Sequence, residues 1–329
     1  MVRHGAGLNA TKFSMEETMT KREFDPRRTI VLSDGKSLGE NTLRMFAQAS
    51  IDVSRTHLRD DVAALRGCPG FSMAVFGRAD QVAWLVAQGY MAAGITGHDQ
   101  VIEGCADVHT VVALPFNRAT TGSELSCVIF TREDNKMATL RGMRMFKRTS
   151  VVTEYPREVA AYLQQHDIWA DVIPCTGKAE MLVRIGIAEY GATITETGTS
   201  IRVNGLKIVR TPEVFRSTTL LVANKEMYAE PEVREYIDFL GRLLKGVLEA
   251  RGKLLLAVNA PRDRADAISQ YLVMRGATLS GPGIKDIHGR PELCAIDSVV
   301  PIDDLNEIQI ELTRLGATGF IPLVPKTII

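Results

Sequence analysis

Residues 29–46 read TIVLSDGKSLGENTLRMF, and they predict a strand, a turn and a helix in succession. The apolar run 29–32 has the length of a short buried strand, and the small polar residues 33–37 predict a turn. Leu43 and Phe46 then follow at helical spacing. A strand, a tight turn and a helix form the repeating unit of an α/β sheet, so this segment predicts the fold class.

The same alternation of strand and helix continues toward the C-terminus. A second block begins at residue 125, which predicts two α/β lobes with a cleft between them. The expected strands are 71–76, 93–96, 111–114, 125–130, 150–152, 170–174 and 218–223, and the expected helices are 79–88, 156–166 and 179–185.

The last third of the chain has a different pattern. Apolar residues recur at helical spacing over 231–251, which predicts a long connecting helix. After Gly252 the order is strand, helix, strand, strand, helix, strand, which is the ferredoxin-like arrangement. The expected segments are 253–258, 262–274, 277–285, 293–300, 302–315 and 319–322.

Composition limits the classes of function. In the 329 residues, 39 Lys and Arg balance 39 Asp and Glu, so bulk charge predicts neither nucleic acid nor membrane as a partner. The apolar runs are all shorter than the ~20 residues that span a bilayer. Five widely spaced cysteines fit free thiols in a reducing, cytoplasmic setting. Residues 1–28 have no apolar period and are expected to form a mobile tail.

Four segments carry a resemblance to a known family. Together, and in this order, they are similar to ATP phosphoribosyltransferases of the long, three-domain form, from about residue 29 to the C-terminus. The segments are Gly94-Ile95-Thr96-Gly97-His98-Asp99, Thr197-Gly198-Thr199-Ser200-Ile201-Arg202-Val203-Asn204-Gly205-Leu206, Phe215-Arg216-Ser217-Thr218-Thr219-Leu220-Leu221-Val222-Ala223-Asn224, and the stretch from Ser298-Val299-Val300-Pro301 to Gly316-Ala317-Thr318-Gly319.

The resemblance implies an architecture. Two lobes of the type II periplasmic-binding-protein kind would form the catalytic core, followed by a C-terminal ferredoxin-like α+β domain with a regulatory role. The implied boundaries are 29–122 with 212–228 for lobe I, 123–211 for lobe II with the phosphate-binding loop, 229–252 for the connecting helix, and 253–329 for the regulatory domain.

The resemblance also implies an activity. Family members transfer phosphoribosyl from phosphoribosyl pyrophosphate (PRPP) to N1 of ATP and release pyrophosphate with the help of Mg²⁺, as the first step of histidine biosynthesis. Histidine or a related effector is expected at the C-terminal domain, and homo-dimers or hexamers are the expected assemblies.

A Thr- and Gly-rich segment is the candidate phosphate loop. Such a displacement mainly requires groups that hold phosphates, which small hydroxyls and backbone N–H groups can do. Glycine permits close backbone approach, while a simple surface turn is the alternative interpretation of the same residues. The candidate residues for the 5-phosphate of PRPP are Glu196, Thr197, Gly198, Thr199 and Ser200.

Glu180 is the candidate catalytic residue, because the resemblance puts it in the cleft beside the ribose or its metal. A carboxylate suits ribose hydroxyls or Mg²⁺ waters, although a glutamate in the first turn of a helix is also common at the surface. We find no nucleophile-base pair and no metal-ligand cluster in the sequence. The weaker candidates, for the nucleotide, are Lys36, Arg78, Thr96, Gly97, His98 and Lys178.

Several positions depart from the family's usual pattern. Ser37 stands where an arginine is usual, Asp80 replaces the second of two arginines, and Ala92 and Thr193 each replace an aspartate, while Glu196 adds a negative charge at the expected phosphate loop. Arg118 and Arg184 are candidates for restoring positive charge. We keep three alternatives: a diverged enzyme of a purine-antibiotic pathway of the coformycin type, a catalytically silent regulatory subunit, and a solute-binding protein.

Overall fold

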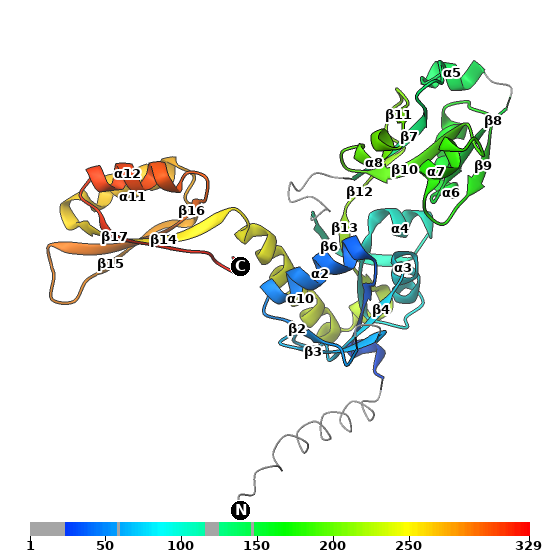
Figure 1. Ribbon diagram of the computed structural model, residues 1–329. Coiled ribbons are helices and arrows are strands. Elements are labelled where there is room, and N and C mark those ends of the chain that lie inside the picture. Colours follow the sequence, from blue (N-terminus) through cyan, green and yellow to red (C-terminus); the bar gives the residue numbers. More distant parts are fainter. Residues whose placement is uncertain (1–23, 58–59, 116–124, 146–147) are drawn as a thin grey trace, which may run out of the picture.

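The computed structural model describes residues 24–57, 60–115, 125–145 and 148–329, which form three sheets with helices packed against them (Figure 1). The first two sheets build a two-lobed core of the periplasmic-binding-protein type II kind, and the third sheet belongs to a C-terminal unit that extends away from the core (Figure 1). In the described part of the chain, none of the helices is long and apolar enough to cross a bilayer.

The first lobe is built on a seven-stranded sheet with the order β2-β3-β4-β1-β5-β13-β6. Its central strands β4, β1 and β5 run parallel, whereas β13 runs antiparallel to β5 and β6. The strands are β1 Thr29–Ser33, β2 Asp52–Ser54, β3 Val62–Arg66, β4 Met73–Gly77, β5 Ala93–Gly97, β6 Val108–Leu114 and β13 Thr219–Asn224, and the helices after β1, β4 and β5 are α2 Lys36–Gln48, α3 Ala79–Ala87 and α4 His98–Glu103.

The second lobe is built on a sheet with the order β11-β7-β10-β8-β9, and β12 also pairs with β7. Strands β10, β8 and β9 run parallel, so the loops after them leave from one edge. The elements are β7 Leu125–Arg132, α5 Leu140–Met145, β8 Thr149–Thr153, α6 Pro156–Gln165, β9 Ala170–Pro174, α7 Ala179–Arg184, β10 Tyr190–Thr195, α8 Thr199–Val203, β11 Leu206–Ile208 and β12 Phe215–Ser217.

The chain crosses back to the first lobe at Thr218. Ser217 is the last residue of β12 in the second sheet, and Thr219 is the first residue of β13 in the first sheet. A single residue therefore separates the two sheets on the return path. The strand predicted over 218–223 is observed as β13 in the first lobe, whereas β12, which precedes it in the second lobe, was not predicted.

A long helix leads from the core to the C-terminal unit. Helix α9, Lys225–Ala229, is followed by α10, Pro231–Ala250, whose Pro231 lies at the first helical position, where proline is well tolerated. Its buried stripe, which includes Ile237 and Leu240, packs into the core of the first lobe. The helix predicted over 231–251 is thus observed almost in full.

The C-terminal unit has an antiparallel sheet with the order β15-β16-β14-β17, which is the ferredoxin-like topology. The predicted α/β class with a ferredoxin-like C-terminal domain is therefore confirmed. The predicted helix over 262–274 begins with a 3-10 turn, and the helix predicted from residue 302 begins only at Leu305. The elements are β14 Lys253–Pro261, η2 Arg262–Arg264, α11 Ala265–Met274, β15 Thr278–Asp286, β16 Leu293–Pro301, α12 Leu305–Arg314 and β17 Thr318–Leu323.

Ordered structure begins before Thr29. Residues 1–23 of the expected tail lie outside the described residues, but Pro26–Arg28 form a 3-10 turn, η1. Arg27 forms an ion pair with Glu230 at 2.9 Å, and the N–H of Ala92 donates to the carbonyl of Pro26. The end of the expected tail is thus attached to the first lobe.

Candidate active site

The loops of the second lobe converge at the carboxyl edge of its three parallel strands. In α/β sheets, ligands bind in the crevice outside this edge. The loop after β8 carries Glu154, the loop after β9 carries Cys175 to Lys178, and the loop after β10 carries the predicted phosphate segment. The topology therefore brings Glu180 and residues 196–200 together, as the candidate site requires.

The predicted phosphate loop is a tight turn between β10 and α8. Gly198 has φ +66°, and its N–H donates to the hydroxyl of Thr195 at 2.8 Å. A side chain at this position would be strained, because L-residues avoid positive φ. The hydroxyls of Thr197 and Thr199 lie 2.8 Å apart, and both residues are exposed. The turn thus presents two adjacent hydroxyls to solvent at the sheet edge.

Glu180 contacts this loop directly. It lies in the first turn of α7, and its Oε1 accepts a hydrogen bond of 2.9 Å from the hydroxyl of Ser200. The exposed Lys178 precedes α7 in the left-handed conformation, with φ +58°. The structure therefore joins a carboxylate and a hydroxyl, with a lysine two residues before the carboxylate, and these groups suit ribose hydroxyls and phosphate oxygens.

Two further residues of this edge were missed by the sequence analysis. Arg202 folds back over the loop, with Nη2 3.4 Å from the hydroxyl of Thr199, and supplies positive charge there. Glu154 follows β8 and lies close to Gly177 and Cys175. Burial, and then the negative charge of Glu154, raise the pKa of the Cys175 thiol. The position of Arg202, one turn after Gly198, was the signal available for it.

The first lobe presents a second set of loops at the carboxyl edge of β4, β1 and β5. Arg78 follows β4, Lys36 begins α2 after β1, and His98 follows β5. Because these strands are adjacent and parallel, the three residues leave from the same edge. Three of the nucleotide candidates thus start from neighbouring strands.

Arg78 and Asp80 form an ion pair. Nε of Arg78 lies 3.2 Å from Oδ1 of Asp80, and both side chains are more than half exposed. Such exposed pairs contribute little to stability. The departure at Asp80 therefore lowers the net positive charge of this loop, while its carboxylate in the first turn of α3 interacts favourably with the helix dipole.

Thr96 has a structural contact. It is fully buried, and its hydroxyl donates to the carbonyl of Ala79 at 3.1 Å. This bond attaches the end of β5 to the start of α3. Thr96 therefore orients the strand end instead of offering its hydroxyl to a ligand in this arrangement.

Hydrogen bonds hold both the backbone N–H and one ring nitrogen of His98. Its N–H donates to the carbonyl of Thr218, and its Nδ1 lies 3.2 Å from the carbonyl oxygen of Arg216. Since a carbonyl can only accept, Nδ1 carries the proton, and Nε2 of the neutral ring is an acceptor. Such an acceptor can bind an amino group of a base.

The other departures lie at different distances from the site. Ala92 is buried before β5, at the amino edge of the sheet, so it lies away from the loops. Thr193 is half-buried within β10, and Glu196 is half-buried in the loop itself. Ser37 lies in the first turn of α2.

Arg118 and Arg184 were the candidates for restoring positive charge to the cleft. Arg118 falls outside the described residues. Arg184 ends α7, which runs away from the carboxyl edge, so it lies toward the opposite edge from Lys178. Arg202 and not Arg184 is the cation next to the phosphate loop.

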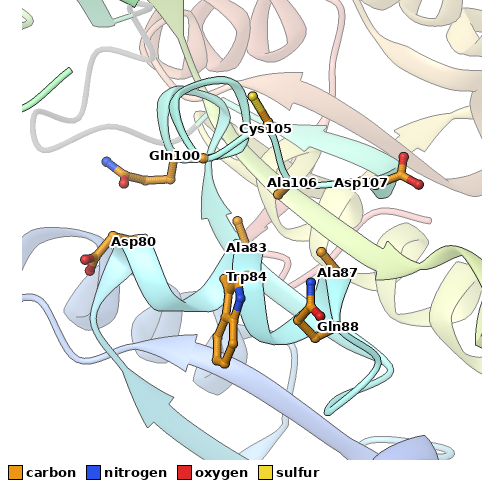
Figure 2. Close-up of a pocket in the computed structure, with 10 residues that line it drawn as sticks. Asp80, Ala83, Trp84, Ala87, Gln88, Gln100, Cys105, Ala106 and Asp107 are labelled. Atoms are coloured by element: carbon orange, nitrogen blue, oxygen red, sulfur yellow. The ribbon is translucent and has the colours of Figure 1, made fainter. Parts of the chain in front are cut away.

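Two observations limit other kinds of site. A hollow of about 160 Å³ lies between α3, α4 and the start of β6, lined by residues that include Asp80, Trp84 and Gln100 (Figure 2). It is smaller than a typical ligand pocket, and of the candidate loops it touches only Asp80. Among the described residues, no group of three or more His, Cys, Asp or Glu is arranged to hold a metal ion.

Comparison with known proteins identifies the family. The HisG family, described as ATP phosphoribosyltransferase, matches residues 78–246, and the HisG C-terminal domain matches 250–323. A relative from Gemmatimonas aurantiaca named ATP phosphoribosyltransferase is 30% identical over 295 residues, covering 89% of this chain and 96% of its own length. A relative of the same name from Methanothermobacter thermautotrophicus is 32% identical over 246 residues, covering 74% of this chain and 79% of its own length.

A solved structure agrees with this assignment at the level of fold. It is the ATP phosphoribosyl transferase (HisG:HisZ) complex from Thermotoga maritima, which superposes with a TM-score of 0.50 at 17% identity and covers 64% of this chain and 98% of that one. The topology, the two family matches and the relatives agree, and this chain belongs to the ATP phosphoribosyltransferase family.

Proposed function

We propose that this chain transfers the phosphoribosyl group of PRPP to N1 of ATP, the first step of histidine biosynthesis. The C1–O bond to pyrophosphate breaks, pyrophosphate leaves with the bonding electrons, and the N1 lone pair forms the new bond to C1. The main support is that Tyr155, directly after the loop residue Glu154, contacts Asp99, directly after His98. The carboxyl edges of the two lobes therefore meet, and each carries its own polar loop.

On the donor side, we assign the 5-phosphate to the loop at Gly198. The hydroxyls of Thr197 and Thr199 and the guanidinium of Arg202 suit phosphate oxygens. Glu180, whose carboxylate accepts a hydrogen bond from Ser200 in this structure, would accept hydrogen bonds from the ribose hydroxyls. These groups hold the donor so that C1 faces the other lobe, which is the main requirement for a displacement of this kind.

On the acceptor side, we assign ATP to the loops of the first lobe. Nε2 of His98 would accept the adenine amino group, because Nδ1 is already used as a donor. Arg78 would contact the phosphates once released from Asp80. Orienting the base in this way directs N1 toward the donor.

The carboxylates fit a Mg²⁺ ion that arrives with the substrate. Mg²⁺ commonly keeps several waters and binds through one or two carboxylates together with phosphate oxygens. Glu180 and Glu154, both at the carboxyl edge of the second sheet, are the residues we assign to this contact. When bound, the ion would neutralise charge that develops on the leaving pyrophosphate.

Regulation and assembly are further parts of the proposal. The ferredoxin-like unit after α10 is available for histidine or a related effector, and we propose a homo-oligomer in the cytoplasm. The Thermotoga maritima protein was solved as a complex of two kinds of subunit, so a second kind of subunit is an alternative partner. Size-exclusion chromatography with light scattering, with and without histidine, measures the assembly.

Pyrophosphate release tests the proposal. Purified protein with Mg²⁺ should release pyrophosphate only when PRPP and ATP are both present, and Glu180→Gln should lower the rate. The second candidate is a catalytically silent subunit, which the Arg78–Asp80 ion pair favours because it neutralises a substrate-facing cation. Binding of PRPP without pyrophosphate release would support that candidate and contradict catalysis.

A further inference from the structure

Helix α6 of the second lobe is capped by a residue of the first lobe. Its own N-cap residue, Tyr155, makes no side-chain cap hydrogen bond in the described structure. The first N–H groups of a helix have no partner within the helix. Glu103, the last residue of α4, accepts two of them: Oε1 from the N–H of Arg157 at 2.9 Å and Oε2 from the N–H of Glu158 at 3.0 Å. A carboxylate there also interacts favourably with the helix dipole.

A second contact joins the same two helices from the other end of α4. Asp99 is only 7% exposed, and its Oδ2 accepts a hydrogen bond of 3.1 Å from the hydroxyl of Tyr155. Its Oδ1 accepts the hydroxyl of Ser217, which ends β12 just before the chain crosses between the sheets. Gly97 leaves the space for this carboxylate, because a Cβ there would lie 2.1 Å from Oδ1 of Asp99.

We propose that Asp99 and Glu103 are positioning residues for phosphoribosyl transfer. They hold α4 against α6, and so set the angle at which the carboxyl edge of β5 faces that of β8. This inference rests on the proposed function, in which each edge binds one substrate. A change in that angle would separate N1 from C1 while leaving each binding loop intact.

This geometry predicts a specific kinetic signature. Loss of the junction should slow the chemical step, because small misplacements of reacting groups cost on the order of 10²-fold in rate. Binding of PRPP alone should be unchanged, since the loop at Gly198 and Glu180 lies within the second lobe. Damage to the fold would instead reduce the fraction of protein that binds PRPP.

The test compares Glu103→Ala with Glu226→Ala. Glu226 is an exposed acidic residue in the first turn of α9 and serves as the matched control. In Glu103→Ala, hydrogen exchange at the amides of Arg157 and Glu158 should accelerate, and the single-turnover rate should fall about 10- to 100-fold. The stoichiometry and affinity of PRPP binding, measured by calorimetry, should match the wild type. The control should change none of these quantities.

Tyr155→Phe provides a second variant. It removes only the hydroxyl bond to Asp99 and keeps the ring that packs edge-on against Phe215 at 5.3 Å. We expect a smaller fall in single-turnover rate, again with normal PRPP binding. Glu103→Ala could damage the fold and so reduce the amount of protein that binds PRPP. In that case Tyr155→Phe is the variant that tests whether the junction positions the substrates.

Unaltered amide exchange in Glu103→Ala would show that the cap is not formed in solution and would overturn the inference. Faster exchange with a wild-type single-turnover rate would also overturn it, because the junction would then not position the substrates. If the wild-type chain itself fails to release pyrophosphate, the proposed function fails, while the exchange data still report on the junction.

Discussion

Substitution of Gly198 by alanine should weaken PRPP binding far more than it weakens the fold. Gly198 has φ +66°, a conformation that costs a residue with a Cβ about 1–2 kcal/mol. The new Cβ would lie 3.1 Å from Cδ1 of Ile208 and 3.3 Å from Nη1 of Arg202. Both are ends of flexible side chains, so the fold can adjust, but the Arg202 guanidinium must shift by a few tenths of an ångström from its place beside Thr199.

The loss of donor affinity follows from that movement. A hydrogen bond to a charged group contributes about 1.5–3 kcal/mol, so loss of one phosphate contact should weaken PRPP binding about 10- to 150-fold. Calorimetry measures the affinity and denaturant unfolding measures the stability.

Gly205→Ala is the matched control for this substitution. Gly205 has φ +70°, and no described heavy atom lies within 4 Å of the position that its Cβ would occupy. It should lose similar stability and keep wild-type PRPP affinity. Equal PRPP affinity in both variants would refute the assignment of the loop to the donor.

Three further predictions concern other parts of the chain. Asp80→Asn should release Arg78 from its ion pair and lower the KM for ATP, with a stability change under about 1 kcal/mol because the pair is exposed. Gly246→Ala should displace the C-terminal residues, because a Cβ would lie 2.8 Å from the carbonyl oxygen of Ile328, and the Ile328 amide should exchange faster. Alkylation of Cys175 should reach its half-maximal rate at a higher pH than a free thiol, because burial and nearby carboxylates raise its pKa and keep the thiol protonated.

Controls for these predictions are available in the same chain. For Gly246→Ala, the control is Gly241→Ala in the same helix, where a Cβ would make ordinary contacts of 3.4 Å. An unchanged KM for ATP in Asp80→Asn would remove Arg78 from the nucleotide site. A Cys175 alkylation profile that coincides with that of a free thiol would contradict its half-buried position near Glu154 and Glu180.

Local sequence patterns predicted much of the fold. The helical spacing of apolar residues in 231–251 was sufficient for α10, and the order of elements after Gly252 was sufficient for the ferredoxin-like unit. Short elements such as α4 and β12 were missed, because few residues contribute to their pattern. Their positions depend on contacts with distant segments, such as that of Ser217 with Asp99, 118 residues apart.

The candidate site could be predicted only in part for the same reason. The Gly198 loop has its own local signature, whereas the bond between Ser200 and Glu180 depends on which strands are neighbours. Thr96 lies in a motif that suggested nucleotide contact, yet tertiary packing buries it and uses its hydroxyl. The position of Arg202 one turn after Gly198 can be read from the sequence, but the return of its side chain toward Thr199 depends on the geometry of α8.

Identification of the product distinguishes phosphoribosyl transfer to ATP from mere binding of the two substrates. Purified protein should be incubated with ATP, PRPP, Mg²⁺ and a pyrophosphatase that removes the released pyrophosphate, and the nucleotides analysed by mass spectrometry and NMR. We predict ATP that has gained one phosphoribosyl group, with the new bond at N1. Unmodified ATP, in the presence of PRPP shown to bind, would exclude phosphoribosyl transfer to ATP by this chain.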